Sequence, residues 1–150
     1  MRGRLEILKP ERIIYQTKIG PYNDFNHEAM TAIRQFANEN ELGDSVFYGI
    51  IHDNVAITPA EECRYDACVA IAEEFVIPES SSFQEGKVQG GKYIAVDVED
   101  NKPAIERAWI EIFPEVMKKG YSIDMSRKII ERYSTNKQEK NCYELLIPVQ

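Results

Sequence analysis

One carboxylate in this chain stands between aliphatic and aromatic side chains, in a pattern typical of a partly buried acid. Within the segment 128–133, Glu131 has Ile129 and Tyr133 two residues away on either side, and an extended chain places all three on one face. A carboxylate withdrawn from water requires a cation or hydrogen-bond donors, so Tyr133 or a ligand cation can pair with it. The alternatives are an ordinary hydrated glutamate and a pair with an internal arginine.

The chain also carries eight tyrosines, six phenylalanines and one tryptophan, which supply flat apolar surfaces. A cation over such a ring gains about 0.5–2 kcal/mol per contact. We expect four aromatic residues to line a ligand site: Tyr48, Trp109, Phe113 and Tyr133. Trp109 and Phe113 are equally suited to packing a helix on a sheet. Tyr22 follows a turn at the start of a helix, where it contacts a ligand or acts as a hydrophobic staple.

The residues predict no metal or cofactor site. His27 and His52 are the only histidines, and no cysteine or carboxylate stands near either one at metal-ligand spacing. His52 and Asp53 are neighbours on a predicted strand, so their side chains point to opposite faces and do not form a catalytic pair. The sequence has no phosphate-binding, dinucleotide-binding or serine-nucleophile motif.

The elements that must position these residues follow the order strand, helix, strand, strand, taken twice. The first half contains a strand over 12–18, the turn Gly20-Pro21-Tyr22, a helix capped by Asn23 or Asp24 and ending at Gly43, and strands over 46–52 and 65–71. A connector over 78–91 follows. The second half contains a strand over 92–98, a helix capped by Asn101 with Pro114 inside it, and strands over 128–133 and 142–147.

This pattern predicts an α+β fold of one domain, 1–150, with repeat halves of approximately 1–77 and 87–150. From other folds built by duplication, we expect two βαββ units about a pseudo-twofold axis. Their antiparallel sheet would carry two main helices that flank a ligand cleft.

Composition narrows the classes of protein. The chain has 150 residues, of which 43% are hydrophobic and 29% charged, which suits one globular domain. Its net charge of −7 disfavours nucleic acid and is compatible with a cationic ligand. No segment is long and apolar enough to span a membrane, and no signal peptide is seen. Three cysteines without metal or redox spacing favour reduced thiols, so we expect a cytoplasmic protein.

Several short motifs resemble the GyrI-like domain, also called the AraC-type effector-binding domain. They occur in the family's order and cover nearly the whole chain: Gly20-Pro21-Tyr22, Tyr48-Gly49-Ile50-Ile51-His52-Asp53, Cys63-Arg64-Tyr65-Asp66-Ala67-Cys68, Gly90-Gly91-Lys92-Tyr93, Lys119-Gly120-Tyr121, Glu131-Arg132-Tyr133 and Leu146-Ile147-Pro148-Val149. The resemblance implies a duplicated βαββ fold and a ligand cleft, with Glu131 as the glutamate that faces cationic or amphipathic molecules. Two positions depart from the family: Val116 replaces a frequent tryptophan, and the usual His-Asp-Asp-Pro reads His52-Asp53-Asn54-Val55.

Three classes of function follow. The first is a ligand-binding module for small organic cations, without an attached DNA-binding domain and without a direct nucleic-acid or membrane partner. The second is a hydrolase of electrophilic small molecules, with Glu131 as general base beside Tyr133. The third is a protein-interaction module that resembles gyrase inhibitors. A protein partner and a homodimer both remain open.

Overall fold

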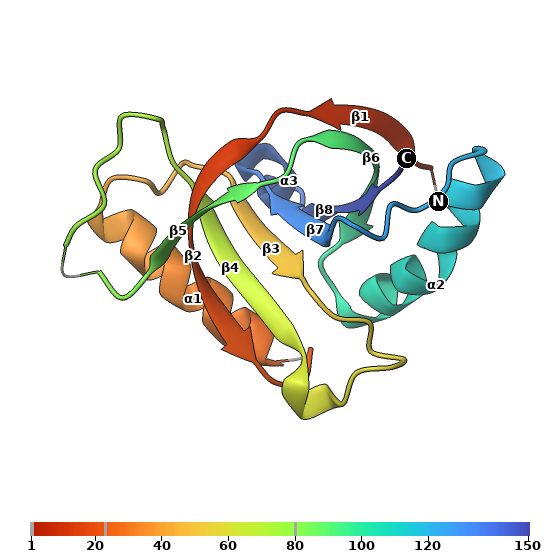
Figure 1. Cartoon of the computed structure of the whole chain (residues 1–150), viewed down its shortest axis with the longest axis horizontal. Coiled ribbons are helices and arrows are strands. Elements are labelled where there is room, and N and C mark those ends of the chain that lie inside the picture. The colour runs from red at the N-terminus through yellow and green to blue at the C-terminus, as the bar shows by residue number, and fades with distance from the viewer. Residues whose placement is uncertain (1, 23, 80) are drawn as a thin grey trace. The chain divides into compact units, whose positions relative to one another are not determined.

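The computed structural model describes residues 2–22, 24–79 and 81–150, and the side chains of residues 24 and 25 are not described. It contains eight strands, two long helices and two short helical segments (Figure 1). In chain order these elements are β1 (Arg4–Leu8), β2 (Glu11–Ile19), α1 (Asp24–Glu39), β3 (Phe47–Ile51), the 3-10 helix η1 (Ala60–Glu62), β4 (Arg64–Ala70), β5 (Gln84–Val88), β6 (Gly91–Glu99), α2 (Lys102–Lys118), β7 (Ile129–Tyr133), α3 (Thr135–Glu139) and β8 (Cys142–Pro148).

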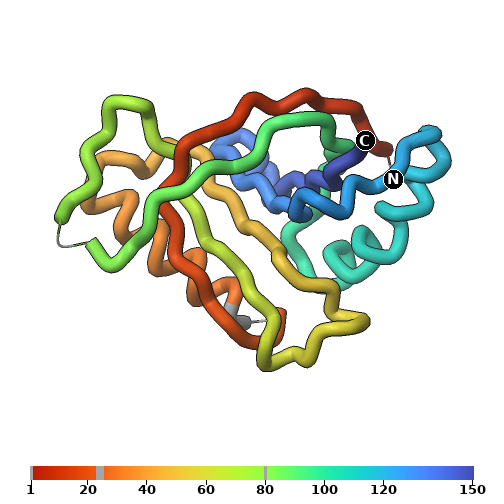
Figure 2. Tube along the Cα trace, in the orientation of Figure 1, coloured from red at the N-terminus to blue at the C-terminus, as the bar shows by residue number. Residues whose placement is uncertain are grey.

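The chain divides into two compact units, and it passes from one to the other twice. Unit 1 comprises residues 1–10 and 89–150, and unit 2 comprises residues 11–88. Both passages can be followed along the trace in Figure 2, from β1 into β2 and from β5 into β6. The edge strand of each unit therefore comes directly before the βαββ segment of the other unit: β1 of unit 1 precedes β2, and β5 of unit 2 precedes β6.

The two units have the same topology. In unit 1 the strand order is β1-β6-β8-β7, and in unit 2 it is β5-β2-β4-β3. All of these pairings are antiparallel, and in each unit the helix connects the first strand of the βαββ segment to its second. The predicted α+β class, with antiparallel pairing and two main helices, is confirmed.

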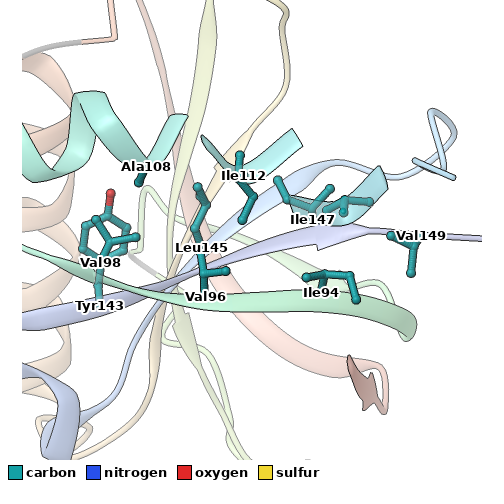
Figure 3. Close-up of a cluster of buried hydrophobic side chains, with 10 residues drawn as sticks. Ile94, Val96, Val98, Ala108, Ile112, Tyr143, Leu145, Ile147 and Val149 are labelled. Atoms are coloured by element: carbon teal, nitrogen blue, oxygen red, sulfur yellow. The ribbon is translucent and has the colours of Figure 1, made fainter. Parts of the chain in front are cut away.

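The core of unit 1 lies between its strands and α2. Alternate residues of β6 and β8 face the helix, because successive side chains of a strand point to opposite faces. They form one buried cluster with three residues of α2 (Figure 3): Ile94, Val96, Val98, Ala108, Ile112, Val116, Tyr143, Leu145, Ile147 and Val149. The helix begins as predicted, since the side chain of Asn101 accepts a hydrogen bond from the backbone N–H of Ala104. Pro114 lies inside the helix, which continues through it to Lys118.

Several elements differ from the sequence prediction. The connector over 78–91 contains a strand, β5, and the segments of β1 and α3 were predicted as neither strand nor helix. The predicted cap of α1 at Asn23 or Asp24 falls outside the described residues and side chains. At the other end of α1, the left-handed residue is Glu41, with φ of 60°, rather than Gly43. The backbone N–H of Leu42 then closes the helix on the carbonyl of Ala37.

Candidate functional site

Strand β7 places Glu131 on the side of the unit 1 sheet that faces α2. Ile129 and Tyr133, two residues away on either side, both pack against the core cluster under α2, so alternation puts Glu131 on the same face. Its exposed fraction is only 9%. The prediction of a partly buried carboxylate between Ile129 and Tyr133 is therefore confirmed.

The Glu131 carboxylate accepts a hydrogen bond from the hydroxyl of Tyr133, with 3.0 Å between Tyr133 Oη and Glu131 Oε1. Burial, and then the negative charge of Glu131, raise the pKa of Tyr133 well above its ordinary value. The phenol therefore stays protonated at neutral pH and remains a donor. The pair can hold a negative charge away from bulk water, which is the condition under which a carboxylate attracts a cation strongly.

Tyr143 on β8 belongs to the same cluster, although the sequence analysis did not single it out. Its ring stacks on that of Tyr133, with centroids 5.2 Å apart and an interplanar angle of 25°. Figure 3 shows its hydroxyl directed toward the α2 side of the sheet. Burial, and then the charges of Glu131 and Asp100, raise its pKa. The only sequence signal was its alternation with Leu145 in a predicted strand.

Trp109 and Phe113 lie on α2, above the same core cluster. Both are partly buried and pack against it, and their ring centroids are 6.3 Å apart at 43°. Packing of the helix on the sheet is therefore one role of these rings. A role as walls of a ligand site is compatible with that packing, because both rings keep part of their surface exposed.

Tyr22 and Tyr48 belong to unit 2, and the hydroxyls of both are hydrogen-bonded there. The Tyr22 hydroxyl donates to the carbonyl of Arg64 and accepts from the backbone N–H of Asp53 at 3.1 Å, which ties the turn before α1 to the ends of β3 and β4. The Tyr48 hydroxyl donates to the carboxylate of Glu11. Both tyrosines thus have structural roles within unit 2, and their predicted contact with a ligand stays a prediction.

The two units do not carry the same chemistry at matching positions. Tyr143 on β8 corresponds to Tyr65 on β4, since both stand one residue before a buried carboxylate in the last strand of their unit's βαββ segment. The residue two positions after Tyr143 pairs with Glu131, whereas the residue two positions after Tyr65 pairs with Gly49. Unit 1 therefore has a carboxylate, Glu131, where unit 2 has Gly49.

The opposite face of the unit 1 sheet carries a network of ion pairs. Arg132 donates to Glu144 at 2.9 and 2.8 Å, and it also donates to Glu6 on β1. Arg4 bridges Glu144 and Asp97. Because successive strand residues point to opposite faces, Arg132 faces this network whereas Glu131 faces α2.

In unit 2, His52 pairs with Asp66 rather than with Asp53. His52 Nε2 lies 2.7 Å from Asp66 Oδ2, and the hydroxyl of Thr17 donates to the other oxygen of this buried carboxylate at 2.6 Å. Asp53 instead accepts from Arg64. Across the described residues, histidine, cysteine and carboxylate side chains form no cluster of three that would suit a metal ion.

The chain belongs to the family of GyrI-like small molecule binding domains, whose model matches residues 2–150. It is 35% identical over 152 residues to YosT of Bacillus subtilis (strain 168), an SPbeta prophage-derived protein named as a transcriptional regulator, with 100% of both chains covered. It is also 24% identical over 139 residues to a DNA gyrase inhibitor of Salmonella typhimurium, with 88% of this chain and 87% of that protein covered.

Solved structures share the fold. SAV2435 bound to tetraphenylphosphonium gives a TM-score of 0.65 at 15% identity, over 100% of this chain and 94% of that one. EcmrR in a complex with DNA gives a TM-score of 0.75 at 14% identity, over 99% of this chain. The match covers 57% of the EcmrR chain, so this chain spans little more than half of EcmrR. In the described part of this chain, no helix is both long and apolar enough to cross a membrane.

Proposed function

We propose that this domain binds small organic cations on the α2 side of unit 1, with Glu131 as the charge anchor. The observation that carries the proposal is the Glu131 carboxylate, which is only 9% exposed and accepts a hydrogen bond from Tyr133. A carboxylate so placed lacks most of its hydration, and a ligand cation can stabilise its charge in place of the missing water. The related fold of SAV2435, described with bound tetraphenylphosphonium, supports a lipophilic cation as the ligand class.

The aromatic residues around Glu131 suit the same ligand. Tyr133 and Tyr143 form a stacked pair beside the carboxylate, and Trp109 and Phe113 extend the aromatic surface on α2. An aromatic face attracts a cation by about 0.5–2 kcal/mol per contact, most strongly where water is excluded. Charge and aromatic surface together therefore favour a flat or bulky organic cation over an inorganic ion.

A thermal-shift experiment with a matched pair of probes tests this proposal. Phenyltrimethylammonium and tert-butylbenzene have nearly the same shape and differ in charge. At about 100 times its Kd, a ligand adds about 2.7 kcal/mol of stability, so the cation should raise the Tm and the neutral probe should raise it less. Trp109, the single tryptophan, should change its emission as the cation binds. An equal Tm shift for the two probes would contradict a charge anchor.

The contact between Tyr133 and Glu131 also supports a second candidate, hydrolysis of an electrophilic small molecule. A carboxylate within 3.0 Å of a phenol that stays protonated provides a general base beside a hydrogen-bond donor. Turnover of an electrophilic substrate that Glu131→Gln abolishes and Glu106→Gln retains would select this reaction. Glu106 is an exposed glutamate on α2 and so provides a control of equal charge change.

We further propose that this domain acts without contacting DNA itself. A net charge of −7 repels phosphates, so a regulatory effect would pass through the ligand or through a protein partner. A gel shift that is specific for one duplex sequence and survives added salt would refute this proposal.

A further inference from the structure

The hydroxyl of Tyr143 is a buried polar group that the fold does not use. The side chain is 1% exposed, and its oxygen finds no hydrogen-bond partner among the described residues. Burying a hydroxyl without a partner costs about 1–3 kcal/mol. Tyrosine hydroxyls that are buried in protein cores ordinarily find a partner.

Packing does not explain this hydroxyl. Leu145, Ile147 and Val149 stand at the alternate positions that follow Tyr143 and join the same apolar cluster, so the position requires only an apolar ring. Phenylalanine would supply that ring and keep the stack on Tyr133 without burying an oxygen. The hydroxyl oxygen therefore lowers the stability of the free protein and forms no hydrogen bond to the described residues in exchange.

Charges near the hydroxyl favour its role as a donor. Glu131 and Asp100 are the acidic groups that act on it, and Tyr133 is the phenol stacked against it. With a raised pKa the hydroxyl keeps its proton, so it donates to any acceptor brought near it. Tyr133 covers the ring of Tyr143 and also occupies one oxygen of Glu131. The carboxylate of Glu131 and the hydroxyl of Tyr143 therefore belong to one cluster with Tyr133, where a single ligand can meet both groups.

We infer that Tyr143 is a specificity-determining residue that selects organic cations carrying a hydrogen-bond acceptor, such as a ketone oxygen beside a quaternary ammonium group. The inference rests on the proposed cation site. In it, Glu131 balances the positive charge, while the hydroxyl of Tyr143 donates to the acceptor and so gains the partner it lacks in the free protein. A cation without an acceptor would satisfy only the first of these two groups.

Phenyltrimethylammonium and its 3-acetyl derivative test this inference, because they share the cation and differ in the acceptor. Calorimetry on the wild-type chain should show tighter binding of the acetyl derivative. Tyr143→Phe should weaken the acetyl derivative about 5- to 10-fold and leave the parent cation unchanged, since one net hydrogen bond is lost. Glu131→Gln should weaken both cations by similar factors. The urea midpoint of Tyr143→Phe should match or exceed that of the wild type.

The outcomes separate the two proposals. Equal effects of Tyr143→Phe on both cations, or on neither, would overturn the role of Tyr143 even where Glu131→Gln confirms the charge anchor. A lowered urea midpoint for Tyr143→Phe would also overturn it, because the hydroxyl would then be stabilising the free protein. If neither cation binds the wild type, or if Glu131→Gln changes nothing, the cation site fails and the inference fails with it.

Discussion

Replacing Arg132 by methionine should destabilise the protein by about 2–3 kcal/mol. Arg132 forms a two-point pair with Glu144, and the two side chains are 15% and 5% exposed. Breaking a buried ion pair by removing one partner costs about 3–5 kcal/mol, because the other charge is left without compensation. The expected loss lies at or just below the low end of this range, since Glu144 keeps Arg4, whose own side chain is 42% exposed.

Urea unfolding measures this loss as a lower midpoint at an unchanged m value. Arg64→Met is the matched control, because the Arg64 side chain is 50% exposed in its pair with Asp53. Asp53 is 14% exposed, but in this variant it keeps the hydrogen bond from the backbone N–H of Arg64 at 2.8 Å. The lost contact is therefore to a half-exposed guanidinium, and the control should lose no more than about 1 kcal/mol. The double variant Arg132→Met/Glu144→Met should recover most of the stability, because it removes the stranded charge along with its partner.

Two results would refute this reasoning. If Arg132→Met costs no more than Arg64→Met, the burial of Glu144 does not govern the energy of the pair. If the double variant is less stable than Arg132→Met alone, the loss comes from packing of the arginine stem and not from an unpaired charge.

Three smaller perturbations follow from local geometry. Asn101→Ala removes the cap of α2 and should cost about 1 kcal/mol in thermal unfolding, whereas Asn101→Asp should not. Gly91→Ala should lower the urea midpoint by more than that, because Gly91 has φ of 130°, a backbone conformation that residues with a Cβ rarely adopt. The hydrogen bond from Arg132 lowers the pKa of Glu6 below its ordinary 4.5. The ionised Glu6 therefore stabilises the folded protein slightly, fully above about pH 4.5, and this contribution is lost as the pH falls through the lowered pKa. Glu6→Gln should consequently lessen acid destabilisation below about pH 4.5.

Each of these expectations has a contrary result. A wild-type Tm for Asn101→Ala would mean that the hydrogen bond to Ala104 contributes nothing. An unchanged midpoint for Gly91→Ala would mean that β6 can begin without the left-handed backbone. A Glu6→Gln profile parallel to that of the wild type between about pH 5.5 and pH 3 would remove Glu6 from the acid response.

Alternation and helical spacing predicted the elements that carry the site. The segment 128–133 predicted β7 and the position of Glu131 on it, because Ile129 and Tyr133 mark one face of a strand. Asn101 and the apolar stripe after it predicted the start of α2 and the side on which Trp109 and Phe113 lie. These features depend on residues close together in sequence, which is why local patterns can reveal them.

The parts missed by the sequence depend on residues far apart in the chain. The segment of β5 is polar and contains Gly86, and it becomes a strand only because it pairs with β2, where the ring of Tyr15 lies against Gly86. The segment of β1 likewise gains its strand from pairing with β6. From the sequence, Tyr143 could not be distinguished from an ordinary core residue. That its hydroxyl is unpaired among the described residues becomes evident only when the neighbouring elements are packed around it.

Calorimetry of phenyltrimethylammonium with wild type, Glu131→Gln and Glu106→Gln tests the central claim most directly. Both variants remove one negative charge, but Glu131 is buried in unit 1 and Glu106 is exposed on α2. Loss of a charge partner in a desolvated site costs about 2–5 kcal/mol. We expect the low end for Glu131, about 2 kcal/mol or about 30-fold in Kd, because its carboxylate also accepts a hydrogen bond from Tyr133. The account predicts that loss for Glu131→Gln and a Kd within about twofold of wild type for Glu106→Gln. Equal losses for the two variants, or no loss for Glu131→Gln, would contradict it.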